Sequence, residues 1–323
     1  MTAAAPPHLL VAHASAASDA GRAAIEALTL PSLSRLLALS TAEAGADDGR
    51  DEYALDAPHE RVLAAAHGWP VEDGRLPWAA AQACDDGLRA EHDTDGPPWG
   101  LLTPVHWHVG SDQVSLVDPA ALALTEPESR ALFEALRPSF DAEGWTLHWG
   151  APLRWYARHA SLAALPTASP DRAIGRSLDL WIGDAPEARR LRRLQVEAQM
   201  IWHTHPVNDA REAAGRLTVN SFWLSGCGPA RPRQPLDGRL EADLRLRAPL
   251  LADQWADWVA AWHALDAGPL ARLLARAEAG ETVTLTLCGE RRAARHVARP
   301  AGWLGRLLRR GRRADARAVL RDL

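Results

Sequence analysis

Short apolar runs that alternate with helical patterns constrain the fold of this chain more than any other feature. The run at 8–12 (His-Leu-Leu-Val-Ala) is compact and apolar, as buried strands are, and the stretch 282–287 alternates Thr with Val or Leu. Helical periodicity separates these two runs, and the longest helix is expected over 185–202. Strands that alternate with helices predict an α/β fold, in which a sheet is sandwiched by helices.

The middle of the chain has a different pattern. Strands are expected on both sides of a turn at 110–113 and again at 145–149 and 154–157, around one helix at 126–136. This pattern predicts a smaller inserted α+β domain, and the acidic stretch 41–57 predicts a surface loop. The predicted domains are 1–103 with 171–290 for the α/β domain, 104–170 for the insert and 291–323 for a basic tail.

Charge is divided unevenly along the chain. All 36 basic residues are arginine, and the formal net charge is −5. The tail 291–323 contains 11 arginines against Asp315 and Asp322, so the remaining body is strongly acidic. An acidic body argues against a nucleic-acid groove, because phosphates require a positive surface. The tail is expected to dock on this acidic body, with a membrane surface or a nucleic acid as alternatives.

Cysteine usage and the absence of a leader pattern bear on the compartment. Cys84, Cys227 and Cys288 are odd in number and widely spaced, which indicates neither a disulfide framework nor a zinc ribbon. The apolar run at 9–12 is too short for a signal peptide or a membrane span. We therefore expect a cytoplasmic protein.

The densest polar segment is 203–211, which precedes a strand expected at 219–224. Arginine offers a bidentate fork to an anion, and Asn and His supply directional hydrogen bonds. The segment predicts a pocket for a phosphate or carboxylate group; in the alternative, its asparagines only tie loop backbone together. The candidate substrate-binding residues are His205, Asn208, Arg211, Asn220, Arg154 and Arg176.

Four histidines are the candidates for a metal site. His106 and His108 share one face of an expected strand, and His203 and His205 have the same spacing. Four such imidazoles could bind zinc, but no carboxylate or cysteine joins them at ligand spacing. We therefore expect structural histidines and no bound metal.

Several segments resemble a known family. The segment 30–37 (Leu-Pro-Ser-Leu-Ser-Arg-Leu-Leu) is similar to the TPNLDRL segment of the archaeal-type cofactor-independent phosphoglycerate mutases, members of the alkaline phosphatase superfamily. The run 205–228 (from His-Pro-Val-Asn to Ser-Gly-Cys-Gly) resembles their HPVN segment and the strand after it. The chain also resembles their bacterial RpfE-type regulatory relatives at 58–61, 77–80, 103–107 and 285–291.

The resemblance implies an alkaline-phosphatase-like sheet but a degenerate metal site. Enzymes of this family use two divalent metal ions and a serine or threonine that is transiently phosphorylated. Their first metal ligand is an Asp just after strand one, where this chain reads His-Ala-Ser-Ala at 13–16. A later DHSTP motif supplies further ligands, where this chain reads Cys-Gly-Glu-Arg at 288–291. Loss of these ligands implies loss of most affinity for manganese or magnesium.

These observations together predict a phosphoglycerate-mutase-like pseudoenzyme with a regulatory or ligand-sensing role. Its ligand would be a small phosphorylated or carboxylate molecule, with no cofactor, no nucleic acid and no membrane span. The tail follows the strand that would carry the last metal ligands. Its arginines are therefore candidates to replace the metal charge near Ser15.

Two alternatives remain open. An active mutase or a phosphatase-type enzyme would hold manganese or magnesium through other residues, such as His13, Asp47 or the histidine pairs. Ser15 or Ser32 would then be the catalytic nucleophile. Alternatively, the protein is a scaffold that recruits a protein partner through its basic tail.

Overall fold

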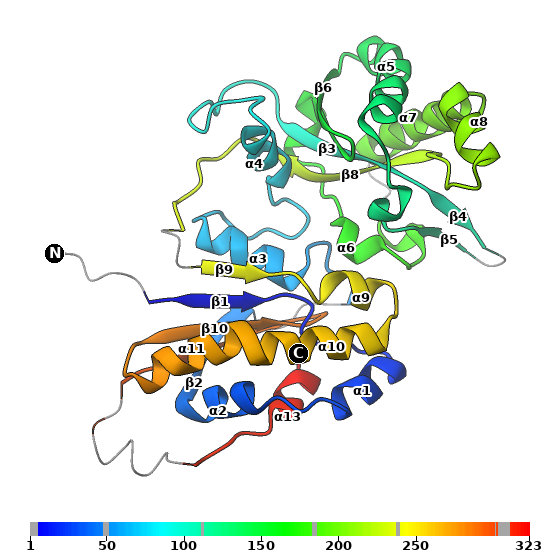
Figure 1. The fold of residues 1–323 in the computed structure, drawn as a ribbon. Helices are drawn as coiled ribbons and strands as arrows, with labels where there is room; N and C mark the ends of the chain where they lie inside the picture. The colour runs from blue at the N-terminus through cyan, green and yellow to red at the C-terminus, as the bar shows by residue number, and fades with distance from the viewer. Residues whose placement is uncertain are drawn as a thin grey trace. The chain divides into compact units, whose positions relative to one another are not determined.

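The computed structural model describes residues 6–47, 52–110, 113–182, 186–236, 240–300, 302 and 311–323, without the side chains of 44–47. The chain forms two compact units, which are coloured by residue number in Figure 1. The first unit contains Met1–Glu52, Ala57–His67 and Pro235–Leu323, and the second contains Tyr53–Asp56 and Gly68–Gln234. The bounds of these two units differ from those of the predicted domains. The sheet of the second unit contains strands from outside the predicted insert 104–170 as well as from inside it.

A mixed sheet of five strands organises the first unit, in the order β2-β11-β10-β1-β9. The central strand β1 (His8–Val11) runs parallel to both β10 (Val283–Cys288) and β9 (Leu240–Asp243). The strand β11 (Ala293–Ala298) pairs antiparallel with β10 and with β2 (Ser40–Asp47). The carboxyl ends of β1, β9 and β10 therefore lie at one edge of the sheet, where open α/β sheets bind ligands.

Helices cover both faces of this sheet. Alternate residues of β1 point to opposite faces, so Leu9 and Val11 join the core beneath the larger helical layer, while Leu10 packs with Val62 and Leu63 of α3. In Figure 1 the larger layer contains α1, α2, α10, α11 and α13. The helices are α1 (Asp19–Glu26), α2 (Pro31–Leu39), α3 (Pro58–Ala66), α9 (Arg247–Leu251), α10 (Trp255–Leu265), α11 (Ala271–Glu278) and α13 (Ala316–Arg321). The predicted α/β class is confirmed: a mixed sheet lies between helices on its two faces.

The second unit contains an antiparallel sheet in the order β6-β7-β3-β8 and a separate hairpin of β4 and β5. Its strands are β3 (Trp99–Val105), β4 (Trp107–Val109), β5 (Val114–Leu116), β6 (Thr146–Ala151), β7 (Arg154–Arg158) and β8 (Ser221–Gly228). Its helices are α4 (Trp78–Asp85), α5 (Glu126–Ala142), α6 (Pro170–Ala173), α7 (Pro186–His203) and α8 (Pro206–Ala213). The predicted strands and the α5 helix of the middle segment are confirmed, while the predicted turn at 110–113 lies partly outside the described residues. Thr125 donates its amide to Glu128 at 3.0 Å at the start of α5.

Both faces of the second sheet are covered as well. Along β7, Trp155 and Ala157 belong to the core shared with α5 and α7, while Tyr156 joins the core beneath α4. The hydroxyl of Ser129, on α5, accepts hydrogen bonds from Nε1 of Trp155 at 2.9 Å and of Trp149 at 3.1 Å. This serine therefore satisfies two indole groups inside the core.

Two local predictions for the first unit are wrong. The stretch 41–57 was expected to be a surface loop, but Ser40–Asp47 forms the edge strand β2, because β11 offers it a partner. Residues 293–298 were assigned to the basic tail, but they form β11 inside the sheet. Neither segment alternates strongly in hydrophobicity, so pairing rather than pattern makes them strands.

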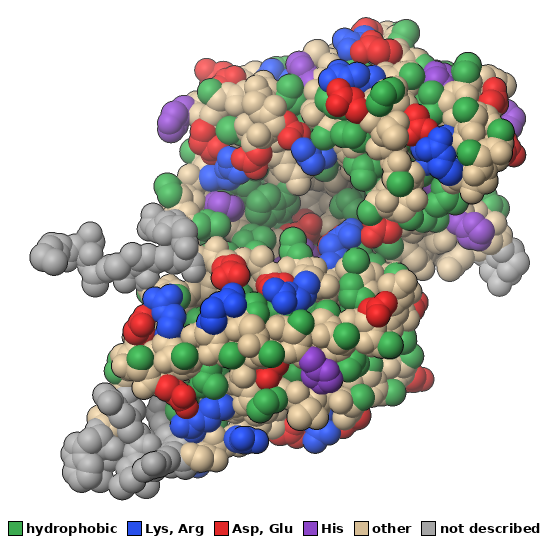
Figure 2. Space-filling view, in the orientation of Figure 1, with side chains coloured by type: hydrophobic (Ala, Val, Ile, Leu, Met, Phe, Trp, Pro, Cys, Tyr) green, Lys and Arg blue, Asp and Glu red, His purple; other side chains and the backbone are tan. Residues whose placement is uncertain are grey.

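The described arginines of 291–323 pair with acids of the first unit. Arg299 lies 2.6 Å from Glu43, Arg291 lies 2.7 Å from Glu52, and Arg321 pairs with Glu26. The pairing of Arg321 agrees with the expected docking of the tail on the acidic body, while 303–310 of this tail lies outside the described residues. A protein partner for the tail stays a prediction. Among the side chains coloured in Figure 2, acids and arginines are intermingled in this view. No helix in the described part of the chain is both long and apolar enough to cross a membrane.

Candidate anion-binding site

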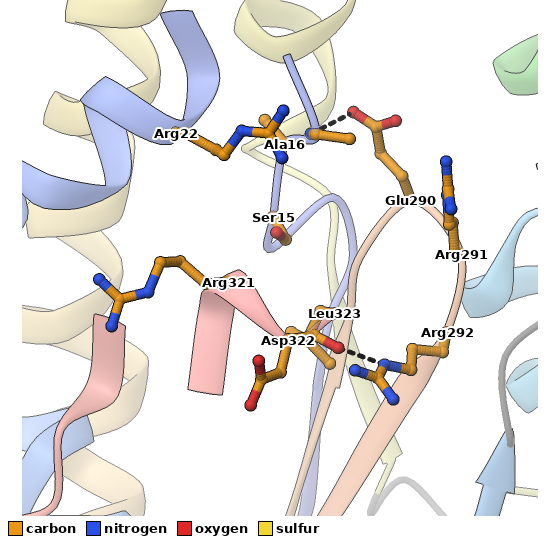
Figure 3. Close-up of a pocket in the computed structure, with 10 residues that line it drawn as sticks. Ser15, Ala16, Arg22, Glu290, Arg291, Arg292, Arg321, Asp322 and Leu323 are labelled. Atoms are coloured by element: carbon orange, nitrogen blue, oxygen red, sulfur yellow. Dashed lines mark hydrogen bonds between the residues drawn. The ribbon is translucent and has the colours of Figure 1, made fainter. Parts of the chain in front are cut away.

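A pocket of about 460 Å³ opens in the first unit beyond the carboxyl ends of β1 and β10 (Figure 3). Its lining comes from the turn between β1 and α1, the turn between β10 and β11, and the end of α13. This volume falls in the range of about 300–1,000 Å³ typical of small-molecule sites. The lining residues are Ser15, Ala16, Ala17, Arg22, Glu290, Arg291, Arg292, Arg321, Asp322 and Leu323.

The turn between β1 and α1 is held by contacts on both sides. His13 has a φ of 56°, in the left-handed region that non-glycine residues rarely adopt. Its carbonyl accepts a hydrogen bond from Nε1 of Trp258 at 3.3 Å, and the next amide, of Ala14, donates to Cys288 at 2.8 Å. Ser18 then caps α1 by accepting from the amide of Gly21 at 3.1 Å. These contacts fix the backbone on which Ser15 lies.

The turn between β10 and β11 is closed by the end of α13. The amide of Arg292 donates to the carbonyl of Leu323 at 3.3 Å, and its guanidinium donates to the carbonyl of Asp322. A Cβ on Gly289 would lie 2.5 Å from Cβ of Leu323, so only glycine permits this approach. The segment that ends at Leu323 therefore forms one wall of the pocket.

Arginine outnumbers acidic residues in the lining, with Arg22, Arg291, Arg292 and Arg321 against Glu290 and Asp322. Arg22 pairs with Asp19 at 3.3 Å, Arg291 with Glu52, and Arg321 with Glu26. Among the described side chains, no Asp or Glu carboxylate lies within 4.0 Å of the Arg292 guanidinium, which donates instead to the carbonyl of Asp322. An excess of arginine beside a sheet edge suits a phosphate or carboxylate ligand.

Ser15 contributes a hydroxyl to this cationic pocket. Only 5% of the residue is exposed, and Figure 3 shows it at the centre of the labelled residues. Its hydroxyl has no hydrogen-bond partner among the residues that the structure describes. This hydroxyl is not among the fully enclosed unpaired side-chain atoms of the described residues, so it is accessible from the pocket and can form a hydrogen bond with a ligand oxygen.

The second predicted nucleophile, Ser32, lies elsewhere in the first unit. It is near the start of α2, where the carboxylate of Asp266 accepts the amides of Ser32 at 3.1 Å and Leu33 at 2.8 Å. The amino end of α2 is thus already occupied by an anionic side chain. Ser15, and not Ser32, belongs to the pocket lining, and a nucleophilic role for either stays a prediction.

Arg211 and Asn208, predicted to bind the ligand, are buried in the second unit. Arg211 is 0% exposed, and its guanidinium donates to the carbonyls of Leu217 and Leu122 and to Glu128. Asn208 donates from Nδ2 to the carbonyls of Trp202 at 2.8 Å and Val219 at 2.7 Å. These contacts hold the backbone around α8, which agrees with the alternative that asparagines of this segment tie loops together.

The other predicted ligand-binding residues also contact protein groups of the second unit. Asn220 bonds both main-chain groups of Trp107, at 2.7 and 2.9 Å. Arg154 forms two hydrogen bonds with Asp86, at 2.7 and 3.0 Å, and Arg176 lies 5.9 Å from the ring of Trp181. His205 caps α8 through Nδ1, and burial lowers its pKa. A ligand role for these residues stays a prediction.

The four candidate metal ligands do not form one cluster. Nδ1 of His106 lies 2.8 Å from the carbonyl of Thr218, and His205 caps α8, while His108 and His203 are exposed. In the described parts of the chain, no group of three potential ligand atoms includes any of these four histidines. The side chain of Asp47, a further candidate, lies outside the described residues.

The donor atoms at the pocket do not fit two hard divalent ions. Manganese and magnesium take several carboxylate oxygens. In the lining, Glu290 accepts the Ala17 amide at 3.0 Å, and the four guanidinium groups would repel cations. Asp243, at the end of β9, already binds Arg245 at 2.7 Å.

A pair of imidazoles lies at the same edge of the sheet. The ring centroids of His13 and His59 are 4.9 Å apart. Imidazole ligates zinc-like ions more readily than magnesium.

Reasoning from the sequence identified part of this site. Ser15 follows a predicted strand, and the tail arginines were expected near it, as Arg291, Arg292 and Arg321 are. Arg22 was missed, because an arginine on a helix is ordinarily a solvated residue. No pattern in the sequence shows that the first turn of α1 faces the end of α13.

Comparison with known proteins gives only distant similarities. No family model and no curated protein matches the chain. The solved cofactor-independent phosphoglycerate mutase from Thermoplasma acidophilum DSM 1728 is 13% identical, with a TM-score of 0.38 over 92% of this chain and 90% of that chain. The PH0037 protein from Pyrococcus horikoshii is 12% identical, with a TM-score of 0.43 over 97% and 92%. The function proposed below therefore rests on the pocket.

Proposed function

We propose that this protein binds a small phosphorylated or carboxylate molecule in the pocket beyond β1 and β10. In this proposal it is a regulatory or ligand-sensing relative of the phosphoglycerate mutases, not a two-metal enzyme. The observation that carries the proposal is the excess of arginines over acidic residues in a lining that includes the Ser15 hydroxyl, which makes no hydrogen bond to any residue that the structure describes. The sequence resemblance supplies the choice of phosphoglycerate as the first ligand to test.

Each part of the lining has a separate role in this proposal. Arg292 supplies a charge that pairs with no Asp or Glu side chain among those that the structure describes, and Ser15 supplies a neutral donor. Arg321 lies on the wall formed by α13 and exchanges part of its pairing with Glu26 for the ligand. No bond is made or broken, so the pocket acts by binding alone.

Isothermal titration of the full chain with 3-phosphoglycerate tests the proposal. We expect saturable binding that Arg292→Gln weakens by about 10- to 100-fold, because a charge-assisted hydrogen bond contributes about 1.5–3 kcal/mol. Arg276→Gln is the matched control, since Arg276 pairs with Glu281 on the surface of the same unit. Absence of saturable binding, or equal affinities of the two variants, would refute the proposal.

The His13–His59 pair favours one second candidate, a phosphoryl-transfer enzyme with an unusual metal site. In that case the two imidazoles would hold a single metal ion of the zinc-like class, which would supply Lewis-acid chemistry, and Ser15 would lie nearby in sequence as a candidate nucleophile. Two assays separate this candidate from the binding protein. Stoichiometric metal in the purified protein, together with chelator-sensitive conversion of 3- to 2-phosphoglycerate, would establish the enzyme and contradict a role in binding alone.

A further inference from the structure

The carboxylate of Glu290 occupies a donor group that an anionic ligand would use. Its Oε1 accepts a hydrogen bond from the amide of Ala17 at 3.0 Å, immediately before the capping residue Ser18 of α1 (Figure 3). The positive end of the α1 dipole lies beside this amide and favours an anion there, because the first N–H groups of a helix are directed toward the residues that precede it. The protein thus already holds one of its own anions at this place.

The start of α1 is shaped for a close approach of such groups. A Cβ on Gly21 would lie 2.4 Å from Cβ of Ala16 and 3.0 Å from the ring of Trp255, so glycine lets the first turn of α1 pack directly on the preceding loop. This packing keeps the loop amides and the α1 side chain of Arg22 on the lining of one pocket. The arrangement is therefore set by the fold before any ligand arrives.

Ser15 gives an independent indication that a ligand oxygen belongs here. The residue is 95% buried, lines the same pocket, and has no hydrogen-bond partner for its hydroxyl in the described part of the chain. Arg22 adds a cation whose own partner, Asp19, is fully exposed and 3.3 Å away, an arrangement of small energetic value. The lining of one pocket thus contains an amide, a hydroxyl and a guanidinium, all of which can donate hydrogen bonds to an anion.

We propose that the Ala17 amide, the Ser15 hydroxyl and Arg22 form a subsite for the phosphoryl group of a phosphate monoester, and that Glu290 fills it until the ligand displaces its carboxylate. The inference rests on the function proposed above and adds the place and the chemical class of the bound group. A phosphoryl group has three terminal oxygens and a charge near −1.5 to −2, about twice that of a carboxylate. The larger charge strengthens the interaction with the guanidinium, and three oxygens outside one plane can each take one of the three donors, so the subsite selects phosphate esters over simple carboxylates.

Glu290 sets the affinity in this arrangement, because its carboxylate competes with the ligand for the Ala17 amide. Removal of its charge should strengthen binding of glycerol 3-phosphate by about tenfold, since the ligand no longer displaces an anion. Removal of the Ser15 hydroxyl should weaken it. Glycerate, which carries a carboxylate but no phosphate, should bind weakly to every form.

The test combines affinity with the signal of one amide. Glycerol 3-phosphate is titrated into the full-length ¹⁵N-labelled wild type, Glu290→Gln and Ser15→Ala, while the Ala17 amide is followed by NMR. Glu281→Gln removes a paired acid from the same unit outside the pocket and is the control. Thermal unfolding checks that each variant is folded. We expect a saturable shift of the Ala17 amide, tighter binding by Glu290→Gln, weaker binding by Ser15→Ala and no change in the control.

Two results would overturn the inference in distinguishable ways. If glycerol 3-phosphate binds with the Arg292 dependence given above, but the Ala17 amide does not shift and Glu290→Gln binds no more tightly, the subsite is wrong and the pocket stands. If neither 3-phosphoglycerate nor glycerol 3-phosphate binds, both the subsite and the proposed function fail.

Discussion

Gly289 links the fold of the first unit to the shape of its pocket, and Gly289→Ala tests that link. The added Cβ would lie 2.5 Å from Cβ of Leu323 and 2.8 Å from its backbone carbon and oxygen. Carbon atoms pack best at about 3.5–4.0 Å, so Leu323 must move by about 1 Å or more. Leu323 is 9% exposed, and its carbonyl accepts the Arg292 amide. Overpacking and loss of this bond together should lower the free energy of unfolding by about 1–3 kcal/mol.

Urea denaturation followed by tryptophan fluorescence measures this change, and titration with 3-phosphoglycerate measures its effect on the pocket. Because Arg321 and Asp322 precede Leu323, the displaced wall should also weaken ligand binding. Gly302→Ala is the control, since a Cβ there meets nothing within 4 Å. A Gly289→Ala protein as stable as the control, within about 0.5 kcal/mol, would refute the packing argument.

Three further predictions concern buried polar groups. Burial and Arg295 lower the pKa of His8 to about 4. The unfolded chain binds this proton below about pH 6.5, so up to about 3 kcal/mol of stability should be lost as the pH falls from 6.5 to 4. His8→Gln should flatten the denaturation profile in that window, and an unchanged profile would contradict the assignment. Ser129→Ala leaves two indole groups without an acceptor and should lower the free energy of unfolding by about 2–4 kcal/mol; a smaller loss would show that the core rearranges. Arg211→Met should cost about 3–5 kcal/mol in the same assay, whereas normal stability with lost ligand binding would restore its predicted ligand role.

Elements with strong local patterns were predictable from the sequence. The compact apolar run of β1, the periodicity of α2 and α7 and the alternation of β10 all appear in short windows of sequence. The start of α5 was predictable because Thr125 and Glu128 stand at capping-box spacing.

Strands that depend on distant partners were not predictable. The strand β9 reads Leu-Glu-Ala-Asp and forms because β1 offers a parallel edge. The strands β2 and β11 are rich in alanine, which has low intrinsic preference for strands, and they form by pairing with each other and with β10. Pairing with strands distant in the sequence, and not local strand propensity, therefore makes these segments strands.

The candidate site also contains residues that the sequence placed correctly and a choice that the sequence could not decide. Ser15 could be placed because ligand sites follow strands in α/β folds, and the tail arginines because they follow β10. The choice of Arg292 over Arg211 could not be made from residue type. The choice depends on how many hydrogen-bond acceptors each guanidinium finds within the protein. The Arg211 guanidinium donates to three protein acceptors, including Glu128, whereas the Arg292 guanidinium donates to one carbonyl and lines the pocket.

A crystal structure of the full chain soaked with 3-phosphoglycerate, in buffer free of phosphate and sulfate, tests the central claim most directly. We predict density for the phosphoryl group in the pocket of the first unit, within hydrogen-bond distance of Ser15 and a guanidinium of the lining. A ligand bound instead in the second unit beside Arg154 or Arg176, or no ligand at saturating concentration, would contradict the account.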